Sequence, residues 1–145
     1  MQRSVRFYRD LVGMEVVGEP GESINPAYDE LLGGVGLRLE LCWLREGAFL
    51  LQLVHYLDGG GPALELNHNS VGAPHMSFVV DDVDEKFAEL RQQNDAVFMS
   101  EIVDLGMARC FYIQDPDGLP VEFCGASSDE ARETAETLLQ SKRPS

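Results

Sequence analysis

The sequence has few basic residues, no long apolar run and no secretory signal. Its 11 lysines and arginines stand against 25 aspartates and glutamates, which gives a formal net charge of −14 at pH 7. Such a surface repels phosphate backbones, so we expect no nucleic-acid partner. No apolar run approaches the roughly 20 residues of a membrane-spanning helix, and the polar N-terminus lacks a signal-peptide core. We therefore expect a cytoplasmic protein without a membrane partner.

Cysteine is also scarce. The three cysteines are odd in number, widely spaced in sequence and form no Cys-x-x-Cys pair: Cys42, Cys110 and Cys124. This usage is typical of reduced, partly buried thiols in a cytosolic protein. The 145 residues suit one domain, and 44% apolar with 25% charged residues is ordinary for a globular chain.

The first half predicts a helix followed by three strands. The helix covers residues 4–12, with Ser4 as its N-cap and Gly13 as its terminator. Strands are predicted at 14–17, 35–44 and 48–56, with a loop over 19–34. In the second strand, alternation predicts one face made of Val35, Leu37, Leu39, Leu41 and Trp43.

The second half begins with a predicted strand at residues 74–80, after a long glycine-bearing loop. Asp81 or Asp82 can cap a helix in which Val83, Phe87 and Leu90 share a stripe. Further strands are predicted at 96–100, 107–114 and 119–125. A final helix begins near Ser127, where Ser127 and Glu130 resemble a capping box.

The two halves repeat each other. Matching Tyr8 with Phe87 superposes the two helices, and Gln52 and Glu122 then fall in the middle of each half's last strand. The strand that carries His75 corresponds to a position ahead of Met1. The repeat therefore predicts a further strand that precedes the sequence.

His75 and Glu122 are the strongest candidates for chemistry. His75 starts a strand, and Glu122 follows the Asp-Pro-Asp-Gly turn in another strand. A buried, unpaired carboxylate is costly or becomes protonated, which favours a metal or a hydrogen-bonded partner for Glu122. The alternatives are an exposed or structural histidine and an outward-facing glutamate.

Gln52 shares a strand face with Leu50, Val54 and Tyr56. An amide on an apolar strand needs a partner, which is either a metal or substrate, or a neighbouring backbone group. His55 points to the opposite face, so we do not expect it to be a ligand.

Three segments resemble the vicinal oxygen chelate superfamily, which includes glyoxalase I, methylmalonyl-CoA epimerase, extradiol dioxygenases and bleomycin-resistance proteins. They are RSVRFYRDLVGMEVV at 3–17, HMSFVVDDV at 75–83 and YIQDPDGLPVEF at 112–123. The resemblance implies an α+β fold in which paired βαβββ modules form a curled mixed sheet around a cleft. It implies one domain over 1–125, with modules at about 1–57 and 74–125 joined by loop 58–73, and a helical tail over 126–145.

The same resemblance implies metal ligands on the first and last strands of each module. Carried onto this sequence, these are Gln52, His75 and Glu122, with a fourth position ahead of Met1. A shortened sequence, or a strand supplied by a partner subunit, would account for that position. The metal is divalent, and imidazole ligation leaves Zn, Ni, Co, Fe and Mn open.

The leading functional hypothesis is a metal-dependent lyase or isomerase that acts on a carbon next to a carbonyl. Glu122 is the candidate base as well as a ligand, and the Gln52/Glu122 pairing favours an epimerase-like isomerase. Candidate substrate contacts are Tyr56, Arg109 and Tyr112, each of which could instead serve packing or lie on the surface. The alternatives are an extradiol-type dioxygenase and a metal-free small-molecule-binding protein. The expected partners are a small-molecule substrate and a second copy of the chain in a homodimer.

Overall fold

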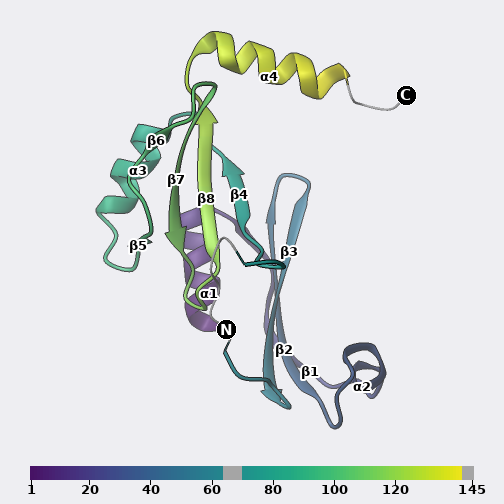
Figure 1. The fold of residues 1–145 in the computed structure, drawn as a ribbon. Coiled ribbons are helices and arrows are strands. Elements are labelled where there is room, and N and C mark those ends of the chain that lie inside the picture. Colours follow the sequence, from purple (N-terminus) through teal and green to yellow (C-terminus); the bar gives the residue numbers. More distant parts are fainter. Residues whose placement is uncertain (64–69, 142–145) are drawn as a thin grey trace. The chain divides into compact units, whose positions relative to one another are not determined.

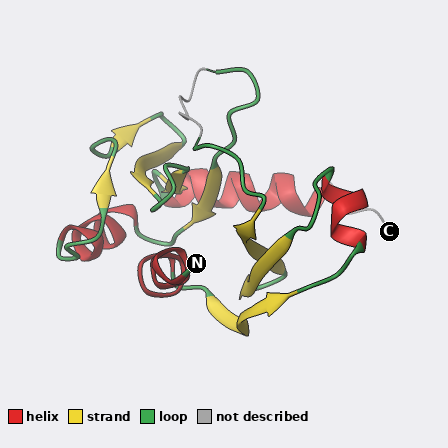
Figure 2. Cartoon of the chain, turned by 90° about the horizontal axis from the view of Figure 1, so that it is seen from below, coloured by secondary structure: helices red, strands yellow, loops and turns green. Residues whose placement is uncertain are grey.

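The computed structural model describes residues 1–63 and 70–141 of the chain (Figure 1). The chain forms two compact units, residues 1–65 and 66–145, which are described separately below. Helices and strands account for most of the described residues (Figure 2). Within the described part, no helix combines the length and apolar character needed to cross a membrane.

The first unit begins with a helix that ends at a glycine. α1 (Gln2–Arg6) continues into the π-helical segment η1 (Phe7–Val12), and Gly13 closes it with a left-handed φ of 100°. Its apolar face is buried, with Tyr8 and Leu11 among the core residues. The predicted start is wrong: the Val5 N–H already donates to the Met1 carbonyl, so Ser4 lies inside the helix and does not cap it.

Three antiparallel strands follow in the order β1-β2-β3. Their bounds are β1 (Glu15–Ser23), β2 (Arg38–Glu46) and β3 (Phe49–Asp58). β1 is longer than predicted, and the helix α2 (Ala27–Leu32) lies within the predicted loop. Pro20, a residue uncommon within strands, lies in the middle of β1. It is tolerated because β1 is an edge strand whose register shifts between Gly18 and Gly21, so Pro20 has no pairing position to fill.

The predicted one-sided alternation in β2 is wrong. Leu39 is buried, but Trp43 on the same face is 37% exposed, and Val35 lies outside the strand and is 92% exposed. On the opposite face Cys42 and Leu44 are fully buried. β2 is thus covered on one face near its start and on the other near its end. A period-of-two pattern cannot show this, because apolar residues occupy both faces of the strand.

The second unit contains β4 (Met76–Val79), α3 (Val83–Arg91), β5 (Val97–Phe98), β6 (Val103–Asp104), β7 (Ala108–Gln114), β8 (Pro120–Ala126) and α4 (Asp129–Ser141). The sheet order is β4-β8-β7-β5, with β6 also paired to β7. β4 runs parallel to β8, whereas the other pairs are antiparallel. This mixed sheet with flanking helices confirms the α+β class.

The helix caps of this unit follow local chemistry. Asp82 caps α3 as predicted, since its Oδ1 accepts a hydrogen bond from the Glu85 N–H at 2.9 Å. For α4 the predicted cap is shifted by one residue. Ser128 Oγ accepts from the Ala131 N–H, whereas the Ser127 hydroxyl donates to the Gly106 carbonyl.

An aromatic core fills one face of the second unit's sheet. Phe111 stacks on Phe123 at 5.4 Å between ring centroids, and Phe87 of α3 meets Phe111 edge-on at 5.0 Å. Phe111 and Phe123 alternate along β7 and β8 with residues of the other face. The aromatic packing therefore leaves the opposite face of β4, β8 and β7 for a different set of side chains.

The two units share their order of elements. In each unit a helix precedes antiparallel strands, and the last of these strands is β3 in the first unit and β8 in the second. In the second unit, β4 pairs with the edge of β8 that does not pair with β7. Among residues 1–63 and 70–141, no strand pairs with the edge of β3 that does not pair with β2.

Candidate functional site

Glu122 is the centre of a polar group on the face of β4, β8 and β7 opposite the aromatic core. It lies directly opposite Tyr112 of β7, and Ser77 of β4 is its partner on the other side. Cys110 and Cys124 occupy the next pair along the same face. The half-buried Glu122 carboxylate is thus surrounded by side chains that can donate hydrogen bonds.

His75 joins this group through Tyr112. It immediately precedes β4, two residues before Ser77, and its side chain is exposed. The His75 and Tyr112 rings meet edge-on, with centroids 5.9 Å apart. The second unit therefore brings three of the predicted site residues together: His75, Tyr112 and Glu122.

The electrostatics of the group centre on Glu122. Burial raises the pKa of Tyr112 to about 12, with further contributions from its hydrogen bond to Glu122 and from the Glu122 charge. Burial also raises the pKa of Cys110 to about 11, again with the Glu122 charge as the next cause. Both groups therefore stay protonated at neutral pH and act as donors towards the carboxylate.

Gln52 lies in the first unit, on the strand β3. It is exposed on β3 directly opposite Trp43 of β2. The Trp43 ring packs over Gly18, where an added Cβ would lie 3.3 Å from Trp43 Cδ1. Exposed apolar side chains continue this face along the strands: Trp43, Leu50, Val54 and Tyr56. Gln52 is thus an isolated amide within an apolar, solvent-facing surface.

His55 and Arg109 each lie on the strand face opposite the predicted site residues of their own unit. His55 Nδ1 is 3.0 Å from Glu40 Oε2, on the face of β3 opposite Gln52, as expected. Arg109 alternates with Cys110, and its Nη2 donates to Asp84 Oδ1 at 3.0 Å. That hydrogen bond also lowers the pKa of Asp84. The structure does not bring Arg109 together with Tyr112 and Glu122.

The residues present fit part of a metal site. His75 supplies an imidazole nitrogen and Glu122 a carboxylate oxygen, the donor types that divalent transition metals accept. Within residues 1–63 and 70–141 no group of three or more His, Cys, Asp or Glu side chains is close enough to hold an ion. The resemblance to the superfamily implies the amide of Gln52 as a further ligand.

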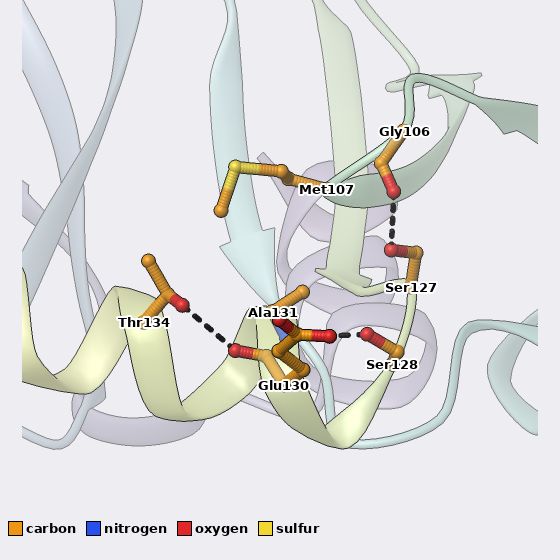
Figure 3. Close-up of a pocket in the computed structure, with 7 residues that line it drawn as sticks. All are labelled: Gly106, Met107, Ser127, Ser128, Glu130, Ala131 and Thr134. Carbon is orange, nitrogen blue, oxygen red and sulfur yellow. Dashed lines mark hydrogen bonds between the residues drawn. The ribbon is translucent and has the colours of Figure 1, made fainter.

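Two surface hollows lie elsewhere in the second unit. One, of about 290 Å³, is lined by Gly106, Met107, Ser127, Ser128, Glu130, Ala131 and Thr134 (Figure 3). Its hydroxyls already bond to the chain, since Thr134 donates to the Glu130 carbonyl at 2.8 Å. The other, of about 400 Å³, lies beside the starts of α3 and α4 and includes Arg109 and Arg132. Neither contains His75, Tyr112 or Glu122.

Three neighbours of Glu122 did not stand out in the sequence: Ser77, Cys110 and Cys124. Ser77 Oγ lies 3.5 Å from Cys124 Sγ. The two cysteines are 14 residues apart in sequence, but they are equidistant from the turn between β7 and β8. Counting back equally along both strands from the Asp-Pro-Asp-Gly turn pairs them.

The family model described as Glyoxalase/Bleomycin resistance protein/Dioxygenase superfamily matches residues 1–123. Among solved structures, a glyoxalase family protein from Bacillus cereus is similar with a TM-score of 0.76 at 17% identity, over 88% of this chain and 87% of that one. The trypanothione-dependent glyoxalase I of Leishmania major has a TM-score of 0.62 at 21% identity, over 99% and 91% of the two chains.

A lactoylglutathione lyase from Agrobacterium tumefaciens is similar with a TM-score of 0.52 at 24% identity, over 86% of this chain and 84% of that one. No curated protein matches the chain significantly. At these identities the structural matches establish the fold.

Proposed function

The chain belongs to the Glyoxalase/Bleomycin resistance protein/Dioxygenase superfamily, and we propose that it is a divalent-metal-dependent lyase or isomerase acting on a carbon next to a carbonyl. The observation that carries the proposal is the grouping of His75, Tyr112 and Glu122 on one face of the second unit. It combines a nitrogen ligand, a carboxylate and a neutral hydroxyl donor within one site.

Glu122 has the central role in this proposal. Its carboxylate removes the proton from the carbon next to the carbonyl and returns it to the same or the neighbouring carbon. Tyr112 holds the carboxylate in place by donating a hydrogen bond to it, and it stays neutral because its pKa is about 12. A tyrosine in this position keeps the base oriented without competing for the proton.

Gln52, His75 and Glu122 are the proposed metal ligands. A divalent ion held there would act as a Lewis acid that stabilises negative charge developing on the substrate oxygens. Tyr56 on the Gln52 face and Tyr112 on the Glu122 face are the proposed substrate contacts. Arg109 is the weakest of the proposed contacts, because its guanidinium is engaged by Asp84.

The choice between lyase and isomerase depends on the ligand set. Two structural neighbours are named as a glyoxalase I and a lactoylglutathione lyase. The combination of an amide at Gln52 with a carboxylate at Glu122 instead favours the isomerase, because it resembles the epimerase-like pattern of one glutamine and one glutamate, whereas glyoxalase I-like sites generally have two glutamates.

A metal-free small-molecule-binding protein is the second candidate. It is supported by the exposed apolar face of the first unit, where Trp43, Leu50 and Val54 surround Gln52. Such a face offers stacking and apolar contact to a flat ligand without any chemistry.

The test is proton exchange with solvent deuterium. Protein supplied with Zn²⁺, Ni²⁺, Co²⁺ or Mn²⁺ would be incubated in D₂O with a 2-oxoaldehyde hemithioacetal and with a 2-methylmalonyl thioester. Mass spectrometry would then follow the hydrogen on the carbon next to the carbonyl. We expect exchange that is lost in Glu122→Gln and kept in Glu85→Gln, which changes an exposed glutamate on α3. Equal exchange in both variants would refute the role of Glu122.

A further inference from the structure

Cys110 and Cys124 form a directly opposed pair on β7 and β8. Cys110 is 7% exposed, and Cys124 is half-buried. All three cysteines of the chain are free thiols, and the third, Cys42, is fully buried in the first unit. The second unit therefore contains two thiols that face each other across adjacent strands, one of them reachable from solvent.

The hydrogen-bond ladder fixes the type of this pair. The Asp115 N–H donates to the Leu119 carbonyl at 2.9 Å, and the Ser127 N–H donates to the Met107 carbonyl at 3.1 Å. These two bonds lie at opposite ends of one unbroken register. Since hydrogen-bonded and non-hydrogen-bonded pairs alternate along an antiparallel ladder, Cys110 and Cys124 form a non-hydrogen-bonded pair.

Non-hydrogen-bonded pairs are the ones in which opposite side chains come closest. Their Cα atoms lie about 4.5 Å apart. Bridged cysteines have Cα atoms about 4.4–6.8 Å apart, so the pair meets this requirement without movement of either strand. Both side chains also point to the same face, because they share it with Tyr112 and Glu122.

We propose that Cys110 and Cys124 are an oxidisable dithiol, which low-molecular-weight disulfides convert to a cross-strand disulfide next to Glu122. The inference goes beyond the proposed function and does not depend on it. It assigns a modification site within the second unit alone.

The chemistry proceeds by two thiol–disulfide exchanges. Cys124, the more accessible thiol, loses its proton to solvent and attacks one sulfur of the oxidant RSSR. A Cys124–S–S–R bond forms and RSH leaves. Cys110 Sγ then attacks Cys124 Sγ, and the Cys124–S–R bond breaks as the Cys110–Cys124 bond forms. The Cys110 proton passes to the departing thiolate, which leaves as the second RSH. The protein loses two hydrogens and two electrons, and RSSR is reduced to two RSH.

Oxidation changes the surroundings of Glu122. In the reduced protein the Cys110 thiol contributes a hydrogen-bonding proton next to the carboxylate, and it also contacts the Glu122 charge. In the disulfide that proton is gone, and Tyr112 is left as the neighbouring donor on β7. The same bond joins β7 to β8 covalently at the position next to the carboxylate.

The test is oxidation of the folded chain with glutathione disulfide, followed by peptide mapping without reduction. We expect a peptide linked through Cys110 and Cys124, a mass lower by two hydrogens and a fall from three titratable thiols to one. Dithiothreitol should restore all three. Cys42→Ala is the matched control, because it removes the buried thiol of the first unit and should still form the same bond.

Single variants isolate the two steps. Cys110→Ala should stop at a glutathione adduct on Cys124, whereas Cys124→Ala should react at least tenfold more slowly, because Cys110 is buried. Circular dichroism before and after oxidation confirms that the protein stays folded. A lasting glutathione adduct on wild-type Cys124, unreacted thiols or a bond through Cys42 would each overturn the proposal.

Discussion

Tyr112 and Glu122 lie directly opposite each other on β7 and β8, in a pair whose backbones do not hydrogen-bond to one another. This is the pair type that brings cross-strand side chains closest, so the Tyr112 hydroxyl can donate to the carboxylate. The His75 ring meets Tyr112 edge-on. Tyr112 therefore links the two predicted ligands of the second unit.

Tyr112 should ionise only under strongly alkaline conditions. Its pKa is raised to about 12, chiefly by burial and then by the Glu122 hydrogen bond. Because the folded-state pKa is above the unfolded value, the associated stability is fully present below pH 10 and is lost as the pH rises towards 12. Tyrosinate absorbance should show a late transition that is absent in Tyr112→Phe and shifts to lower pH in Glu122→Gln. A transition unmoved by Glu122→Gln would contradict the contact.

Asp29 should stabilise the first unit only above acidic pH. Its carboxylate accepts the Gly36 N–H at 2.7 Å and the Leu37 N–H at 2.9 Å, and these bonds lower its pKa. A depressed pKa gives stability that is present above pH 3.8 and lost as the pH falls through the folded-state value. Asp29→Ala should therefore lower the urea midpoint at pH 7 and matter less at pH 3. Glu30→Ala, on the same helix, is the control that should change little.

Phe111 should be essential for the second unit's core. It is fully buried and touches the rings of Phe87, Phe98 and Phe123. Phe111→Ala should lower the free energy of unfolding by about 3–5 kcal/mol, measured by urea denaturation. Phe49→Ala removes a ring that is 49% exposed and should cost less than about 1 kcal/mol. Similar costs for the two variants would argue against the aromatic core.

Metal retention should depend on His75 and Glu122. Protein loaded with a divalent metal and then desalted should keep close to one ion per chain by elemental mass spectrometry. His75→Ala and Glu122→Ala should each reduce retention at least tenfold, because each removes a proposed ligand. His55→Ala, which changes a residue on the face of β3 opposite Gln52, should retain as much metal as the wild-type protein. Loss of metal in His55→Ala alone would assign the site elsewhere.

Trp43 should report ligand binding on the face of the first unit. It is the sole tryptophan of the chain and lies directly opposite Gln52, 37% exposed. An aromatic ligand that stacks there should shift its emission to shorter wavelength, because it removes water from the indole. Leu50→Ser should weaken the response several-fold, whereas Leu31→Ser serves as the control, because it removes an exposed apolar side chain from the helix α2. An unchanged emission at saturating ligand would place binding away from this face.

Local signals predicted much of the secondary structure. Gly13 ends the first helix, and Asp82 caps α3, because a positive φ and an N-terminal carboxylate act within a few residues. The places of His75 just before β4 and of Glu122 on β8 were also predictable, since each lies in a segment with recognisable flanking residues. The capping serines were not predicted correctly, because neighbouring serines at 127 and 128 offer the same chemistry and only the backbone path selects one.

By itself, the sequence determined most of the helices and strands, although not α2 or β6, together with the resemblance to the superfamily and the candidate ligands Gln52, His75 and Glu122. These depend on spacing and turn chemistry along the chain. Only the tertiary structure decided which face of β2 is buried at each end, that Arg109 pairs with Asp84, and that Cys110 faces Cys124 beside Glu122. The reason is physical: burial and cross-strand contact depend on which elements pack against each face, and residues distant in sequence supply those elements.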